Sequence, residues 1–171
     1  MDFKENIVLI GMPGSGKTTV GRHLAQLTGM IFLDLDTEIE RTAGMDIPRI
    51  FSEKGEDTFR QIETDCARKA SRLSGYVIAC GGGIILRQEN MRALGRTGTI
   101  VFLDRSVKEI CASKLDGRPL IAGNLDRVQA LYDQRIALYR QYAEVTVESS
   151  RSPEFVARLV WESLQGQEGV Q

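Results

Sequence analysis

Short apolar segments alternate with amphipathic segments along most of this chain. Mostly apolar runs occupy residues 6–10, 30–34, 76–80, 99–103 and 143–147. A continuous apolar run, rather than a strict alternation, is typical of a strand that is buried on both faces of a parallel sheet. Helical spacing of apolar residues occurs at 17–28, 56–72 and 126–142. We therefore predict an α/β protein with three αβα layers and a five-stranded parallel sheet.

Short polar motifs predict where several helices begin. Thr37-Glu38-Ile39-Glu40 and Ser106-Val107-Lys108-Glu109 both have the spacing of a capping box. Ser152 precedes Pro153, which predicts an N-cap followed by proline at the first helical position. We expect helices to start at these three places.

The length of 171 residues suits one domain, and we expect residues 1–171 to form it. The stretch 115–125 contains two glycines and a proline and lacks clear periodicity, so we predict a mobile loop there. Residues 166–171 are expected to be a frayed, disordered tail.

Charge and cysteine content narrow the class of protein. The 22 Lys and Arg residues nearly balance the 23 Asp and Glu residues, whereas a general nucleic-acid binder usually has a basic excess. The three cysteines have no CxxC spacing, and the lone His23 cannot form a metal cluster. The apolar run at the N-terminus is too short for a signal peptide or a membrane span. We therefore expect a cytoplasmic protein.

A glycine-rich motif lies between the first predicted strand and the first predicted helix. Residues 11–18 match G-x-x-x-x-G-K-[ST] at every position. Backbone N–H groups of such a loop converge on phosphate oxygens, and the helix N-terminus adds the positive end of its dipole. We predict that Lys17 reaches the β- and γ-phosphates and that the Thr18 hydroxyl is a ligand of Mg²⁺. The chain has no Asn-Lys-x-Asp guanine motif, which favours ATP over GTP.

Two aspartates, Asp34 and Asp36, follow the second predicted strand. Ligands bind at this edge in open α/β sheets, and a spacing of two places both carboxylates on one side of an extended chain. One carboxylate can hold Mg²⁺ through water while the other accepts a proton from a substrate hydroxyl. The alternative is structural: Asp36 caps the helix that begins near Thr37, and Asp34 is a solvated strand end.

Further candidate groups follow later strands. Gly81-Gly82-Gly83 offers backbone donors at the same sheet edge, although a helix-entry turn is the alternative. Asp104 ends the fourth strand, but the capping box behind it favours a helix-start turn. Arginine outnumbers lysine 16 to 6, and arginine suits bidentate recognition of carboxylates and phosphates. Three arginines have suggestive settings: Arg60, Arg118 and Arg135.

Taken in order, these motifs resemble those of the shikimate kinases. The matching stretches are GMPGSGKTTVGR at 11–22, FLDLD at 32–36, GEDTFRQIE at 55–63, CGGG at 80–83, GRPLIAG at 117–123 and RIALYR at 135–140. The P-loop alone is widespread, whereas the whole combination is specific and spans roughly residues 5–163. The resemblance implies a nucleoside-monophosphate-kinase-like fold with a lid over about residues 112–124. It also implies phosphoryl transfer from ATP to the 3-hydroxyl of shikimate.

The resemblance assigns roles residue by residue. Asp34 would organise Mg²⁺ through water, Asp36 would bind and polarise the shikimate hydroxyls, and Arg118 would close over the phosphates as the lid arginine. Arg60 and Arg135 would hold the shikimate carboxylate. The implied substrate residues are Asp36, Phe59, Arg60, Gly81, Gly82, Gly83 and Arg135. The implied nucleotide-binding residues are Gly14, Ser15, Gly16, Lys17, Thr18, Thr19, Arg118, Arg151 and Pro153.

The chain departs from the family pattern at two places. The usual Arg-x-Pro-Leu-Tyr lacks its proline in residues 135–139, which bears on the placement of Arg135. Cys111 stands where many members have a basic residue that stacks on adenine. Either Lys108 substitutes for it, or the opposite wall of the adenine site acts alone. Pro153, in that wall, also has a structural reason as the first residue of a helix.

We therefore expect an ATP:shikimate phosphotransferase. Lys17, Mg²⁺ and Arg118 would neutralise charge on the transferring group, while Asp36 orients the hydroxyl. One alternative is a kinase for another small polyol acid such as gluconate, because two arginines do not by themselves distinguish these acids. Another is a non-catalytic nucleotide-binding module. Such a module would be expected to lack Lys17, Asp36 or Arg118, and all three are present. We expect a monomer that binds shikimate and ATP, and neither nucleic acid nor membrane.

Overall fold

The described part of the chain, residues 6–113 and 125–166 of a computed structural model, is built around one sheet. All four strand pairings are parallel, and the strand order is β2-β3-β1-β4-β5. The predicted five-stranded parallel sheet is therefore confirmed. Arg118 and most of the predicted lid lie outside the described residues. The strands are β1 (Asn6–Ile10), β2 (Ile31–Asp34), β3 (Tyr76–Ala79), β4 (Gly98–Asp104) and β5 (Val145–Glu148).

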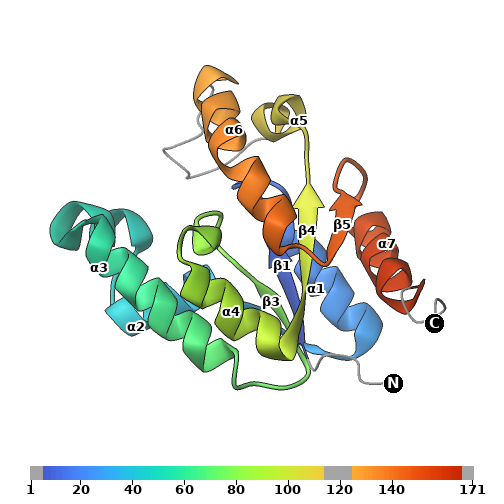
Figure 1. Cartoon of the computed structure of the whole chain (residues 1–171), viewed down its shortest axis with the longest axis horizontal. Coiled ribbons are helices and arrows are strands. Elements are labelled where there is room, and N and C mark those ends of the chain that lie inside the picture. The colour runs from blue at the N-terminus through green and yellow to red at the C-terminus, as the bar shows by residue number, and fades with distance from the viewer. Residues whose placement is uncertain (1–5, 114–124, 167–171) are drawn as a thin grey trace.

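Helices cover both faces of this sheet (Figure 1). They are α1 (Lys17–Thr28), α2 (Leu35–Ala43), α3 (Ile47–Ala70), α4 (Gln88–Thr97), α5 (Val107–Ala112), α6 (Leu125–Tyr142) and α7 (Pro153–Gly166), with a short 3₁₀ turn η1 (Ile84–Leu86). Helices α1 and α7 pack on one face, and α2 to α6 contribute to the core on the other. The three-layer arrangement is the one that the sequence predicts.

Strand β1 explains why the apolar runs are continuous. Ile7 and Leu9 belong to the core beneath α1 and α7, whereas Val8 and Ile10 belong to the core on the opposite face. All four side chains are fully buried. Since successive residues of a strand point to opposite faces, a central strand that is covered on both sides needs apolar residues at every position.

The start of α2 differs from the prediction. The helix begins at Leu35, and its N-cap is Asp34, whose Oδ1 accepts a hydrogen bond from the Asp36 amide at 3.0 Å. The capping box at Thr37 and the capping role considered for Asp36 are therefore wrong. Strand β2 runs directly into α2 without a loop. The last strand residue is therefore the N-cap, and the Thr37 motif lies inside the helix.

The other two helix starts are confirmed. Ser106 forms a reciprocal capping box with Glu109 at the head of α5. The Ser152 hydroxyl accepts from the Phe155 amide at 3.3 Å, and α7 begins at Pro153. Helix α7 continues to Gly166, so the predicted frayed tail starts at least one residue too early.

Helix α3 is longer than predicted and is interrupted by Gly55. It begins after the N-cap Asp46, and Gly55 has φ 83° and ψ 167°, which are not helical values. The residues after this break form the amphipathic helix that the sequence predicts from residue 56. The break matters because the second segment carries Arg60 and Glu63 against the loop that follows β3.

The functional candidates gather at the carboxyl ends of the strands. The P-loop follows β1, Asp34 and Asp36 follow β2, and Gly81-Gly82-Gly83 follows β3. These three strands are adjacent in the sheet, with β4 on the other side of β1. Ligands in open α/β sheets bind at this edge. No helix within residues 6–113 and 125–166 combines the length and apolar character needed to cross a membrane.

Candidate active site

The P-loop joins β1 to α1 in a conformation that depends on glycine. Gly16 is the N-cap of α1 and has φ 91° and ψ 12°, a left-handed conformation that other residues adopt at a cost. The loop therefore turns sharply enough to present the first amides of α1 at the sheet edge. Free amides at a helix N-terminus, together with the helix dipole, form a binding site for phosphate.

Lys17 is held inside this loop. Its ammonium donates to the carbonyl oxygens of Gly11 and Met12, both at 2.8 Å, and to Ser15 Oγ at 3.3 Å. The residue is only 7% exposed. The loop thus fixes a cation beside the helix N-terminus, where the sequence predicts that it meets the terminal phosphates.

Two residues that sequence reasoning missed hold the P-loop from outside. Ser149 is buried, and its hydroxyl donates to the Ser15 carbonyl at 2.7 Å. Arg105 donates from Nη1 to the Gly14 carbonyl at 3.1 Å. Both bonds span about half the chain or more, so no local motif signals them. Ser149 ties the loop between β5 and α7 to the P-loop, and Arg105 ties the connection between β4 and α5 to it.

That loop carries the two predicted adenine-wall residues. Arg151 and Pro153 follow Ser149, whose hydroxyl is bonded to the P-loop, by two and four residues. The Arg151 guanidinium lies 4.7 Å from the centroid of the Phe155 ring. Thr19, another predicted nucleotide contact, is exposed on the first turn of α1.

Thr18 and Asp34 come together as the sequence predicts for a metal site. The Thr18 hydroxyl donates to Asp34 Oδ2 at 2.9 Å, while Oδ1 of the same carboxylate caps α2. Mg²⁺ prefers oxygen ligands and is commonly bound by one or two protein oxygens together with substrate phosphates and water. A hydroxyl and a carboxylate beside a phosphate-binding loop fit that requirement.

Asp36 lies against the glycine loop after β3. A Cβ atom added to Gly81 would lie 2.7 Å from Asp36 Oδ1 and 3.6 Å from Glu63 Oε2. Gly81 therefore leaves the space that the Asp36 carboxylate occupies. Because Asp34 caps α2, the position of Asp36 at the sheet edge is not explained by helix capping.

Both predicted carboxylate-binding arginines lie against the same loop. A Cβ atom on Gly83 would clash with the Arg60 guanidinium, and one on Gly82 would lie 3.2 Å from Arg135 Nη1. The missing proline after Arg135 therefore does not keep this side chain from the loop. The glycines allow two guanidinium groups, from α3 and α6, to approach one segment of backbone.

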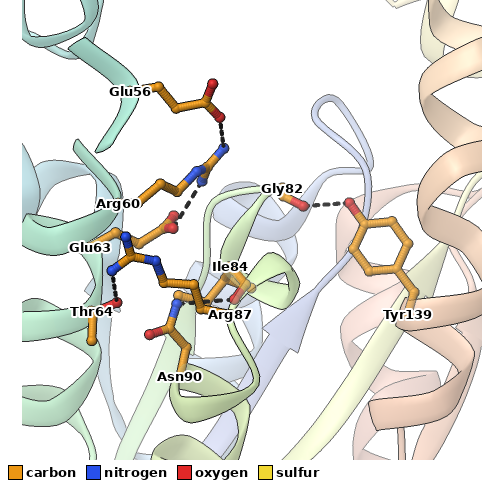
Figure 2. A network of polar contacts seen from close by, with 9 residues as sticks. All are labelled: Glu56, Arg60, Glu63, Thr64, Gly82, Ile84, Arg87, Asn90 and Tyr139. Carbon is orange, nitrogen blue, oxygen red and sulfur yellow. Dashed lines mark hydrogen bonds and ion pairs between the residues drawn. The ribbon is translucent and has the colours of Figure 1, made fainter. Parts of the chain in front are cut away.

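Arg60 is held by neighbouring side chains of α3 (Figure 2). Its Nη1 donates to Glu63 Oε1 at 2.9 Å, and its Nη2 lies 3.5 Å from Glu56 Oε1. Its guanidinium carbon also lies 5.0 Å from the centroid of the Phe59 ring. Among the described residues, the buried Nε of Arg60 has no hydrogen-bond partner. A planar guanidinium held in this way suits recognition of a carboxylate.

Glu63 is the charged residue of the site whose role sequence reasoning missed. Its side chain is 1% exposed and pairs with Arg60, whose side chain is 12% exposed. Burial raises the pKa of Glu63, and the Asp36 carboxylate raises it further, whereas Arg60 and Arg135 oppose this shift. Its position three residues after Arg60 on a helix was the available signal. The cluster thus joins two carboxylates to two guanidinium groups.

The sheet order, the P-loop and its lysine define a P-loop nucleotide-binding protein with a kinase fold. The family model for shikimate kinase matches residues 13–165. A shikimate kinase of Nitrosococcus oceani is 42% identical over 152 residues, which are 86% of this chain and 80% of the relative.

Solved structures agree with this assignment. A shikimate kinase from Acinetobacter baumannii in complex with shikimate has a TM-score of 0.91 and 35% identity, covering 97% of this chain and 96% of that one. A gluconokinase from Sinorhizobium meliloti has a TM-score of 0.59 at 17% identity, covering 96% of this chain and 94% of that one, and shares the fold alone. The chain belongs to the shikimate kinase family.

Proposed function

We propose that this protein transfers the γ-phosphoryl group of ATP to the 3-hydroxyl of shikimate, giving shikimate 3-phosphate and ADP. Membership of the shikimate kinase family supports this reaction. The structural observation that carries it is the approach of Arg60 and Arg135 to one glycine loop beside the P-loop. This arrangement suits a small acid held next to a nucleotide phosphate.

The nucleotide phosphates would bind at the P-loop. Backbone amides at the start of α1 and the Lys17 ammonium would contact phosphate oxygens. Thr18 and Asp34 would hold Mg²⁺, which, when bound with the nucleotide, supplies positive charge to the β- and γ-phosphates. Arg151 and Pro153 would line the adenine side, beyond the bond that joins Ser149 to the P-loop.

The acid would bind at the glycine loop. Its carboxylate would pair with Arg60 and Arg135, since guanidinium groups bind carboxylates through paired hydrogen bonds. Phe59 packs beneath Arg60 and would line the pocket beside the ring of the acid. The three glycines leave room for the side chains of the site, since an added Cβ at each would meet one of them, and the ring of the acid would lie beside these side chains.

Asp36 would orient the nucleophile. Its carboxylate would accept a hydrogen bond from the 3-hydroxyl and then take the proton as the hydroxyl oxygen forms a bond to the γ-phosphorus. The bond from that phosphorus to the bridging oxygen of ADP breaks in the same displacement. Lys17 would stabilise the charge on the transferring group, so that catalysis is mainly positioning and electrostatics.

Arg118 completes this proposal on the strength of the sequence. It matches the arginine that closes over the phosphates in the family, and it would add a second cation to the transferring group. We further propose that the working unit is a monomer of one domain, because the nucleotide and acid sites are both formed by residues of a single chain.

A substrate comparison tests the proposed function. The protein is assayed for ADP release with ATP, Mg²⁺ and one of shikimate, quinate or gluconate, with the Lys17→Met variant as the inactive control. We expect kcat/KM for shikimate to exceed that for each other acid by at least about 100-fold. Gluconate used as efficiently as shikimate would support the alternative polyol-acid kinase. No turnover with any acid would support the non-catalytic module.

A further inference from the structure

Tyr139 is a buried side chain on α6 that connects to the acid site. It is fully buried, and its ring stacks on Phe102 with centroids 5.1 Å apart and an interplanar angle of 13°. Its hydroxyl donates to the Gly82 carbonyl at 2.6 Å, as Figure 2 shows. The bond joins residues 57 positions apart, from α6 to the loop after β3.

Gly82 occupies a narrow position between two functional segments. A Cβ atom there would lie 2.7 Å from Cδ of Pro13, in the P-loop, and 3.2 Å from Arg135 Nη1. Pro13 of the P-loop and the Arg135 side chain therefore both lie against the Cα of Gly82, in space that a larger residue would fill. A group that fixes the Gly82 carbonyl also fixes the spacing of these two segments.

Tyr139 reaches Arg135 as well. The two residues are one helical turn apart on α6, and the Arg135 guanidinium is close enough to the Tyr139 hydroxyl to lower its pKa. Burial raises the pKa of Tyr139 to about 12, although Arg135 acts in the opposite direction. The hydroxyl thus stays protonated at neutral pH. A phenol can donate one hydrogen bond and accept another, so it can serve Gly82 and Arg135 together.

We propose that Tyr139 is a positioning residue for the acid substrate, because it fixes the glycine wall and Arg135 relative to one another. This inference rests on the proposed function and adds a residue to the same site. Tyr139 is not expected to touch the substrate or the reacting atoms. It acts through the Gly82 carbonyl and the Arg135 guanidinium, which hold the acid both before and during the transfer.

The kinetic test compares Tyr139→Phe with Tyr132→Phe. Tyr132 is a matched control, because it lies on the same helix and its hydroxyl donates to Asp104 at 3.2 Å, away from the glycine loop. For Tyr139→Phe we expect KM for shikimate to rise roughly fivefold to tenfold, the equivalent of one lost hydrogen bond. We expect KM for ATP and kcat to stay within about twofold, as for an interaction that is equal in the ground and transition states. An unchanged KM for shikimate, or equal effects of the two variants, overturns the proposal.

A second measurement needs no substrate. The Ile84 and Leu86 amides donate to the Gly81 and Gly83 carbonyls, both at 3.1 Å, in the turn that Tyr139 holds. Hydrogen exchange at these amides should be about tenfold faster in Tyr139→Phe than in the parent, and unchanged in Tyr132→Phe. Equal exchange in all three proteins contradicts the proposal. If the parent fails to phosphorylate shikimate, the proposed function falls, whereas the exchange result still decides whether Tyr139 fixes this loop.

Discussion

Replacing Asp34 separates two roles that one carboxylate has in this structure. Oδ1 caps α2 by accepting from the Asp36 amide, and Oδ2 accepts from the Thr18 hydroxyl beside the P-loop. Asparagine keeps the capping oxygen but removes the negative charge, whereas alanine removes both. The alanine variant should therefore be less stable than the asparagine variant, whereas both should need more Mg²⁺ for half-maximal activity.

The size of each effect follows from the hydrogen bonds that each variant removes. Asp34→Ala loses an N-cap, which contributes about 0.5–2 kcal/mol, and the acceptor for Thr18, about 0.5–1.5 kcal/mol more. A total near 2 kcal/mol lowers Tm by roughly 4–8 °C in a domain of this size. Asp34→Asn retains the cap, and its amide can donate to the Thr18 hydroxyl, so its Tm should stay within about 2 °C of the parent.

The assay is initial rate against Mg²⁺ concentration, with a thermal melt of each variant. Loss of a residue that orients a metal site commonly weakens metal binding about 10–100-fold, and we expect that shift in the half-saturating Mg²⁺ for both variants. Asp46→Asn and Asp46→Ala are the matched controls, because Asp46 caps α3 by accepting from the Arg49 amide. The alanine control should lower Tm and the asparagine control should not, and neither should change the half-saturating Mg²⁺ concentration. An Asp34→Asn enzyme with the parent's Mg²⁺ dependence would show that Asp34 is only a cap.

Three further substitutions test the rest of the site. Lys17→Met should lower kcat far more than it changes KM for shikimate, and a kcat within about threefold of the parent would refute the role of the P-loop lysine. Asp36→Asn should lower kcat by about 10²–10⁴ with little change in Tm, since Asp34 caps α2; unaltered turnover would mean that Asp36 does not orient the hydroxyl. The effect of Glu63→Gln on the free energy of unfolding should depend on pH. Burial raises the pKa of Glu63 in the folded state, so its contribution to stability is present below the usual glutamate pKa and is lost as pH rises through the folded value. The unfolding free energy of the parent relative to Glu63→Gln should therefore fall as pH rises from about 4 to about 8, and a flat difference would contradict this assignment.

The strands could be predicted because burial on both faces leaves a direct mark on the sequence. Every residue of β1 is buried, and its last four are apolar. Helix α4 could not be predicted in this way, because Met91 and Leu94 are the only buried apolar side chains among its ten residues. The capping box places the N-cap of α2 at Thr37, three residues late, because β2 runs directly into the helix and its last residue, Asp34, provides the cap.

The sequence singles out several of the side chains that the structure brings together at the sheet edge, whereas it does not indicate the residues that hold them in place. Lys17, Asp36, Arg60 and Arg135 belong to short motifs whose chemistry is visible in the residue types. The bond from Ser149 to the P-loop spans 134 residues, and no local pattern specifies such a pairing. Tertiary packing selects these partners, so only the folded structure reveals them.

The central claim is the transfer of the γ-phosphoryl group of ATP to one particular oxygen of shikimate. The most direct test is to convert shikimate fully with ATP and Mg²⁺ and to examine the product by phosphorus and proton NMR. We predict one new phosphate monoester whose phosphorus couples to the proton on carbon 3, formed in a one-to-one ratio with ADP. A phosphate on another hydroxyl, or ADP formed without any phosphorylated shikimate, would contradict the account.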